Sequence, residues 1–121
     1  MKRKVLYLLA IMFFPCTAAA EGAASTMASV LSELSHFPSA TDKEALSGIV
    51  EDASSTADEK MLASIISRIA HKASDADKAK LEIILEAKET SQAARTIATA
   101  VLNINHKLQS DDLQAVKALI D

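Results

Sequence analysis

Apolar residues recur at helical spacing along the chain in six stripes. Each stripe places apolar side chains at positions i, i+3 and i+4, and the longer ones also at i+7, which is the pattern of one buried helix face. The three longer stripes are Met27, Val30, Leu31, Leu34; Leu62, Ile65, Ile66, Ile69; and Ile97, Ala100, Val101, Ile104. The three shorter stripes are Leu46, Ile49, Val50; Leu81, Ile84, Leu85; and Val116, Leu119, Ile120. We therefore predict six short amphipathic helices, near residues 23–36, 42–53, 57–71, 75–88, 91–106 and 111–120.

Helix-start signals stand ahead of four of these stripes. Hydroxyl and carboxylate side chains there accept hydrogen bonds from the free amides of a first helical turn. The candidates are two capping-box pairs, Thr41 with Glu44 and Thr56 with Glu59, and two single caps, Ser74 and Ser110. Pro38 breaks the pattern between two stripes, because proline disfavours helix in the residue before it. No Gly or Pro interrupts residues 76–108, so one long helix over 75–106 is an alternative to two helices separated at Thr90-Ser91.

The chain repeats itself with a period of 35 residues. His36, His71 and His106 are each 35 residues apart, and residues 36–70 match residues 71–105 at nine positions without a gap. The identical pairs are His36/His71, Ser39/Ser74, Asp42/Asp77, Lys43/Lys78, Leu46/Leu81, Ile49/Ile84, Glu51/Glu86, Ala63/Ala98 and Ile69/Ile104. The apolar stripes keep the same register upstream and downstream. We therefore predict that each unit is a helical hairpin.

The period and the hairpin content resemble the α-hairpin repeats of the tetratricopeptide type. The aromatic, glycine and proline positions of that consensus are absent, so the resemblance covers the architecture alone. We predict an all-α fold of about six short amphipathic helices in 35-residue helical-hairpin repeats, arranged as a small solenoid or a compact bundle.

Residues 1–20 have the three parts of a secretory signal peptide: a basic start at residues 2–4, an apolar run over residues 5–14 and a small-residue site that ends at Ala20. The apolar run is too short to span a bilayer. We predict cleavage after Ala20, which leaves a single all-α helical-hairpin repeat domain over residues 21–121. The leader is of bacterial type, so the expected destination is the periplasm or the medium.

Cys16 allows one alternative, in which the chain is cleaved before this cysteine and lipidated on it. The residues ahead of it, Phe13-Phe14-Pro15, are larger than such a site normally has. No second apolar span follows the leader, so we expect no stable membrane insertion after cleavage.

The composition of residues 21–121 excludes several classes of protein. This part carries ten basic and sixteen acidic residues, a net charge of −6, and contains no Cys and no Trp. A disulfide scaffold, a zinc ribbon and a thiol enzyme all need cysteine. Nucleic-acid binding needs a basic surface, so we expect no nucleic-acid partner.

The three histidines are candidate metal ligands. In a stacked array, however, equivalent positions lie about 10 Å apart, while zinc–imidazole bonds measure about 2.0–2.1 Å. The predicted helices place His36, His71 and His106 at helix ends, where a charged imidazole gains about 0.3–1 kcal/mol from the helix dipole. We therefore expect helix-end histidines at repeat-equivalent positions and no metal site, with pH sensing as the alternative role.

Other candidate chemistry has structural explanations. Met27 and His106 resemble the axial ligands of a b-type cytochrome bundle, but Met27 shares its repeat position with Leu62 and belongs to the core stripe. The acidic pairs at 58–59 and 111–112 fall in first helical turns, where negative charge is favoured. No calcium loop, zinc-protease, nucleophile-elbow or phosphate-loop motif is present. We expect no cofactor, no catalytic residue and no enzymatic activity.

On these grounds we predict a non-enzymatic periplasmic helical protein that binds another protein. Stacked hairpins present an extended surface for helices or peptides, and an acidic surface favours a basic partner. Such a protein serves as an accessory factor of a secretion- or conjugation-type envelope machine, or as an immunity protein. The alternative is a small-ligand or lipid carrier with an aliphatic cavity between helices.

Overall fold

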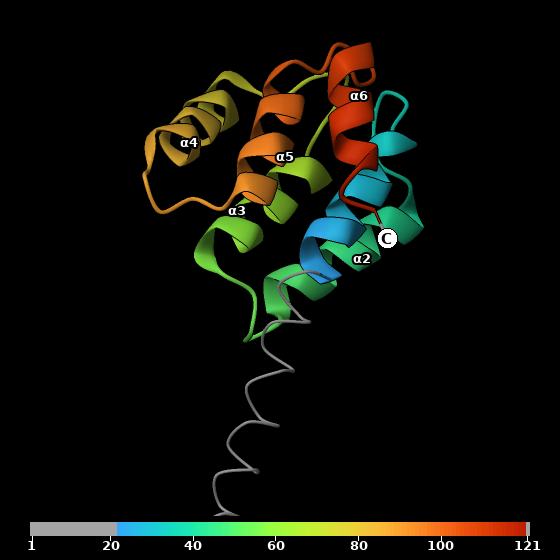
Figure 1. Cartoon of the computed structure of the whole chain (residues 1–121). Coiled ribbons are helices and arrows are strands. Elements are labelled where there is room, and N and C mark those ends of the chain that lie inside the picture. The colour runs from blue at the N-terminus through green and yellow to red at the C-terminus, as the bar shows by residue number, and fades with distance from the viewer. Residues whose placement is uncertain (1–21, 121) are drawn as a thin grey trace, which may run out of the picture.

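The computed structural model of the chain describes residues 22–120, which form six helices and no strand (Figure 1). The first helix covers residues 22–32. It is followed by α2 (Ala40–Glu51), α3 (Ala57–Ser67), α4 (Asp75–Glu86), α5 (Gln92–Leu102) and α6 (Ser110–Lys117). The predicted all-α fold is confirmed. The predicted signal peptide and its cleavage site after Ala20 lie outside the described residues.

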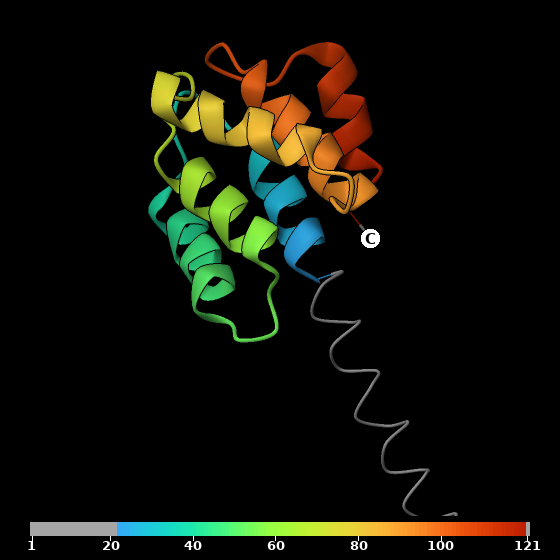
Figure 2. The same ribbon diagram turned by 90° about the vertical axis from the view of Figure 1, so that its left-hand side faces the viewer.

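The helices form two layers. α3 contacts α2, α4 and α5, and α5 also contacts α4 and α6, whereas α2, α4 and α6 make no contact with one another. Figure 2 shows α2 and α3 side by side, with α4 crossing near one end. The first helix, α3 and α5 bury most of their apolar residues and form the inner layer. α2, α4 and α6 form the outer layer and bury fewer.

The burial pattern follows the 35-residue period. All twelve residues of the three longer stripes are buried, at 5% exposure or less, which confirms that the second helix of each predicted hairpin carries the core. Ala28, Ala63 and Ala98 occupy one repeat position and are fully buried as well. The first residue of each outer stripe follows the same rule, because Leu46, Leu81 and Val116 are fully buried. At the second position Ile49 and Ile84 are nearly fully buried, whereas Leu119 is only partly buried.

The third position of the outer stripes was predicted wrongly. Val50 is 38% exposed and Ile120 is 36% exposed, while Leu85 is only partly buried. The reason is geometric: an outer helix contacts the inner layer along one narrow line, so two positions per helix are enough to fill that contact.

The caps agree with the sequence in two of four cases. Thr56 and Glu59 form the predicted capping box, and Ser74 accepts the amide of Asp77. At α2 the box is made instead by Ser39 with Asp42, two residues before the predicted pair. At α6 the N-cap is Gln109, and its side chain makes no cap hydrogen bond, so the expected cap at Ser110 is wrong.

α4 and α5 are separate helices. Ser91 caps α5 by accepting the amide of Ala94, and the buried Thr90 hydroxyl donates to the carbonyl of Ile84, 2.7 Å away. The predicted turn at Thr90-Ser91 is therefore confirmed. None of the described helices combines the length and the apolar run that crossing a bilayer requires.

Candidate functional site

The same tight turn follows each inner helix. A histidine lies four residues after the end of each inner helix, and its φ angle is positive: 72° at His36, 71° at His71 and 72° at His106. This left-handed conformation costs a residue that has a Cβ atom about 1–2 kcal/mol. The residues on either side of each histidine pair through an isolated bridge, such as Ala70 with Lys72. The inner helices thus end four residues earlier than predicted, and the histidines lie beyond the helix ends.

The three turns are joined by a closed triangle of backbone hydrogen bonds. The amide of His36 donates to the carbonyl of His106 at 2.7 Å, that of His106 to His71 at 2.6 Å, and that of His71 to His36 at 2.6 Å. One histidine comes from each of the three turns, so the triangle links the first of these turns to the last. The array therefore closes on itself around a pseudo-threefold axis instead of extending as a solenoid.

The imidazole rings converge on this axis. Their ring centroids lie 4.9–5.1 Å apart, and all three pairs meet edge to face. One ring nitrogen from each histidine lies within 4.8 Å of the other two. The separation of about 10 Å expected for a stacked array is therefore wrong. All three histidines are exposed to solvent.

Two of the rings are oriented by their neighbours. The Nδ1 atom of His106 lies 2.9 Å from Oδ1 of Asn105, and Nδ1 of His36 lies 3.2 Å from Oγ of Ser35. The amide oxygen of Asn105 only accepts, so Nδ1 of His106 donates to it and Nε2 keeps its lone pair. Ala70, the equivalent neighbour of His71, has no polar side chain.

Three repeat positions carry the same residue in all three hairpins, and two of them have a structural explanation. The alanine position (Ala28, Ala63, Ala98) lies in the buried core. The aspartate position (Asp42, Asp77, Asp112) lies in the first turn of each outer helix, where negative charge is favoured. The histidines are exposed and hold a conformation that suits glycine better. Their side chains are therefore the feature that the fold itself does not explain.

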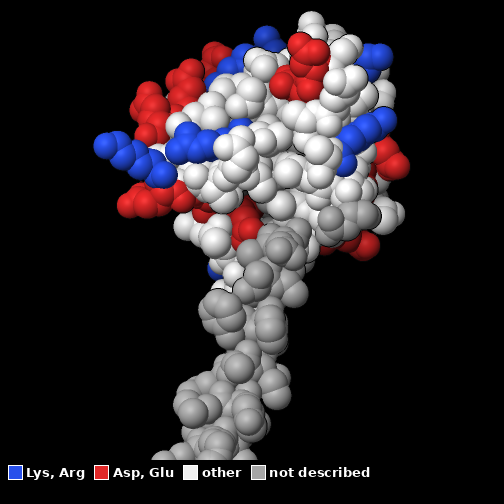
Figure 3. Space-filling model, in the orientation of Figure 1, with Lys and Arg blue, Asp and Glu red and all other residues white. Residues whose placement is uncertain are grey.

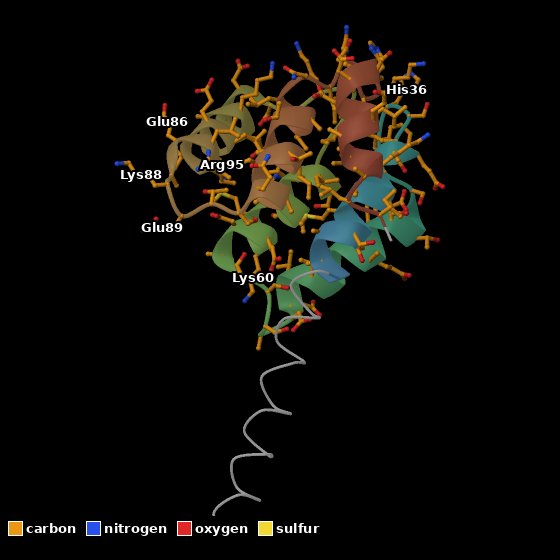
Figure 4. The ribbon with its side chains drawn as sticks, viewed as in Figure 1. His36, Lys60, Glu86, Lys88, Glu89 and Arg95 are labelled. Carbon is orange, nitrogen blue, oxygen red and sulfur yellow. The ribbon has the colours of Figure 1, made fainter. Side chains whose placement is uncertain are left out.

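A cavity of about 600 Å³ lies at the other end of the inner layer. It is lined by Ala24, Met27, Thr56, Asp58, Glu59, Glu89, Ser91, Ala93, Ala94, Ile97, Ala118 and Leu119. These residues come from the beginnings of the three inner helices and from the residues that follow α6. The histidines follow the opposite ends of the same helices. Figure 4 accordingly shows His36 far from Lys60, which lies in the first turn of α3.

The lining of the cavity is largely apolar, and its charged members are acidic. Among the described residues, Asp58, Glu59 and Glu89 are the charged residues that line it, without a Lys or Arg. On the face that Figure 3 shows, acidic and basic side chains together border a broad area without charged groups. The cavity therefore favours a ligand with an apolar body and a positive or neutral polar group.

The loop that carries Glu89 is held by Arg95, which Figure 4 shows between α4 and α5. Its guanidinium donates to the carbonyls of Leu85 at 2.7 Å, Ala87 at 2.6 Å and Thr90 at 3.3 Å. These bonds satisfy carbonyls at the end of α4 that have no helical partner. One part of the cavity lining, Glu89, thus lies on a loop whose backbone is held in place by Arg95.

The remaining residues singled out in the sequence join no common site. Met27 is 1% exposed and lines the cavity, whereas His106 belongs to the histidine triangle, so the two do not form an axial pair. The acidic residues at 58–59 and 111–112 lie in first helical turns as predicted, and Glu59 accepts the amide of Thr56 at 2.7 Å.

Comparison of the chain with protein-family models, with curated proteins and with solved structures finds no match. The functional argument therefore depends on the histidine triangle and the cavity themselves.

Proposed function

We propose that the protein is a non-enzymatic binding protein of the periplasm, exported by its signal peptide, that holds a small apolar ligand between its inner helices. The cavity of about 600 Å³ is the observation that carries this proposal. Its volume lies inside the range of about 300–1,000 Å³ that is usual for ligand pockets. A closed bundle offers no long concave surface, so the carrier function has more support from the fold than the extended protein-binding surface expected of a solenoid.

The lining residues narrow the class of ligand. Alanine, methionine, isoleucine and leucine side chains provide much of the lining, and its three charged residues are all carboxylates. An apolar chain with a cationic head group matches both features, because the chain leaves water while its charge stays near Asp58, Glu59 and Glu89. An anionic amphiphile of the same length would place like charges together.

Paired amphiphiles test this proposal. Isothermal titration of the leader-free protein with octyltrimethylammonium and with octyl sulfate, both below their micelle-forming concentrations, compares head groups at a constant chain length. We expect the cation to bind at least ten times more tightly than the anion. The proposal is wrong if neither compound binds with a dissociation constant below about 1 mM, or if both bind equally.

A pair of matched variants locates the site. Ala93→Leu adds bulk to the wall of the cavity, and Ala79→Leu adds the same bulk to an exposed position of α4 outside it. We expect Ala93→Leu to weaken binding of the cation at least tenfold and Ala79→Leu to leave it unchanged. Equal affinities in the two variants would place the amphiphile elsewhere on the protein.

A protein partner is the second candidate, and the exposure of Ile83 favours it. This isoleucine is 66% exposed on α4, in the middle of charged side chains. A photo-crosslinking amino acid at Ile83 should capture one defined partner in intact cells, while the same group at the exposed Ala79 serves as the control. Identical products from the two positions would argue against a specific interface.

A further inference from the structure

We propose that His36, His71 and His106 together bind one divalent transition-metal ion, such as Zn²⁺, Ni²⁺ or Cu²⁺, on the pseudo-threefold axis. This site goes beyond the proposed function, because it lies at the opposite end of the inner helices from the cavity. Imidazole nitrogen is a preferred ligand of these ions, whereas Mg²⁺ and Ca²⁺ prefer oxygen.

The distances between the ring nitrogens are close to those between three ligands of one metal ion. One nitrogen of each ring already lies within 4.8 Å of the others. Three nitrogens bound tetrahedrally to one zinc ion, each at about 2.0–2.1 Å, would be separated by about 3.4 Å. The rings therefore need to close by up to about 1.4 Å. The hydrogen-bond triangle already fixes the backbone of the three histidines. Rotation of their exposed side chains is therefore enough to supply this movement.

The hydrogen bonds of the imidazoles leave at least one ring, that of His106, with a nitrogen whose lone pair can bind a metal. Nδ1 of His106 donates to Oδ1 of Asn105, which sets the tautomer whose Nε2 lone pair can bind a metal. The contact of Nδ1 of His36 with Ser35 is compatible with the same arrangement. Metal-ligating histidines commonly bind through one ring nitrogen while the other is held by a neighbouring oxygen.

The backbone accounts for the choice of histidine only in part, because histidine is one of several residues enriched in the left-handed conformation. The triangle uses only main-chain amides and carbonyls, so it requires no imidazole. The left-handed conformation favours glycine, yet all three positions carry histidine. Edge-to-face packing of the rings is the competing explanation, since aromatic contacts alone stabilise such a cluster. A test must therefore include a variant that keeps an aromatic ring at one of these positions but has no ring nitrogen.

The surroundings indicate an open site of moderate affinity. Three protein ligands leave at least one coordination position for water or a small anion. Within residues 22–120 no carboxylate belongs to the group of potential ligands, and Lys72 and Lys107 follow two of the histidines in sequence. The exposed lysines are screened by salt and water. We therefore expect micromolar binding instead of the much tighter binding of structural zinc sites.

The composition leaves few competing ligands for a transition-metal ion in a binding experiment. After removal of the leader the chain contains no cysteine, and its only histidines are the three of the triangle. Isothermal titration of tag-free protein with ZnSO₄ at neutral pH should give one ion per chain with a dissociation constant of about 10 μM or tighter. The NMR signals of all three imidazoles should shift together during the titration.

Two substitutions at one position separate metal binding from ring packing. His71→Phe keeps an aromatic ring but removes both nitrogens, and His71→Asn keeps a residue that tolerates the left-handed conformation. We expect both variants to lose at least a hundredfold in zinc affinity, while circular dichroism confirms their helical fold. Lys72→Gln, next to the same turn, is the control and should retain the site.

Three outcomes would overturn the proposal. The first is a wild-type dissociation constant above about 100 μM. The second is a titration in which fewer than three imidazole signals shift. The third is a folded His71→Phe protein that binds zinc as well as the wild type does, which would leave ring packing as the role of the cluster. If both His71 variants fail to fold, the first two measurements on the wild-type protein still decide. Loss of amphiphile binding in the cavity would leave this result unchanged.

Discussion

The link between Arg68 and Asp77 offers a quantitative test of how neighbouring helices are held together. Arg68 is the C-cap residue of α3, and its Nη2 atom donates to Oδ1 of Asp77 at 2.8 Å, while Nε donates to Oδ2 at 3.4 Å. The Asp77 side chain is 8% exposed and that of Arg68 is 48% exposed. The pair joins the end of an inner helix to the first turn of the next outer helix.

Replacing Arg68 with Met removes the guanidinium and leaves the Asp77 carboxylate largely buried. Breaking a fully buried pair costs about 3–5 kcal/mol, whereas an exposed pair is worth about 0–1 kcal/mol. Because one partner here is half exposed, and because the Ser74 hydroxyl also stabilises the Asp77 carboxylate, we expect a loss of about 1–2 kcal/mol in the free energy of unfolding at neutral pH.

The cost should depend on pH in a defined direction. The hydrogen bond from Arg68 is the main cause that lowers the pKa of Asp77 below its ordinary value of 3.8. A carboxylate whose pKa is lowered by folding stabilises the native state fully above its unfolded pKa, and this contribution disappears as the pH falls through the folded pKa. The difference between wild type and Arg68→Met should therefore be complete at pH 6 and shrink progressively below about pH 4.

Urea unfolding of the leader-free protein, followed by circular dichroism between pH 2 and pH 7, measures this difference. Lys80→Met is the matched control, because the Lys80 ammonium lies 4.0 Å from the same carboxylate and is 50% exposed. We expect its effect to stay below about 0.5 kcal/mol. The reasoning fails if the two variants cost the same, or if the cost of Arg68→Met at pH 2.5 equals its cost at pH 6.

Four further outcomes follow from single features of the chain. Glu33 and Asp42 occupy the repeat positions of Arg68 and Asp77, so Glu33→Arg should form the equivalent ion pair and raise the stability to urea by about 0.5–1 kcal/mol; a decrease would show that the repeat units are not equivalent there. Gln109→Ser supplies the missing cap of α6 and should add about 0.5–1 kcal/mol, whereas no gain would mean that this helix end is already satisfied. Ile65→Ala should cost about 2–5 kcal/mol because Ile65 is fully buried, and a cost below about 0.5 kcal/mol would contradict its place in the core. The intact mass of exported protein should correspond to cleavage after Ala20, and a mass that includes an acylated Cys16 would show a lipoprotein instead.

The periodic apolar pattern was enough to predict the inner layer. A helix that packs on several neighbours buries a wide face, so its stripe is long and regular in the sequence. This is why Ile65 and Ile66, together with their repeat equivalents, were assigned correctly to the core. An outer helix packs on one side only, and an apolar residue such as Val50 can then extend the stripe in the sequence without being buried.

The ends of the helices were harder to predict than their existence. Nothing in the hydrophobic pattern marks where the inner helices stop, because Ile69 and Ile104 continue the stripe after the last helical turn and are still buried. The left-handed turn at each histidine sets the actual boundary, and glycine, the usual sequence signal of such a turn, is absent from all three. The caps at α2 and α6 were misplaced for a related reason, since several hydroxyl and acidic residues lie next to one another there.

The order of helices in the chain explains why the histidines meet. The described part begins with an inner helix, residues 22–32, and ends with an outer helix, α6, so each terminal helix lacks the hairpin partner that the internal units have. In an open solenoid these two half-units would leave apolar faces exposed at opposite ends of the array. In the closed array, residues from both ends line the same cavity, and the triangle joins His36 to His106. Ring closure thus completes the third hairpin, and the same closure brings three positions that are 35 residues apart in sequence to within one side chain of a common axis. Identical exposed residues in a closed repeat of this kind are therefore candidates for one shared site.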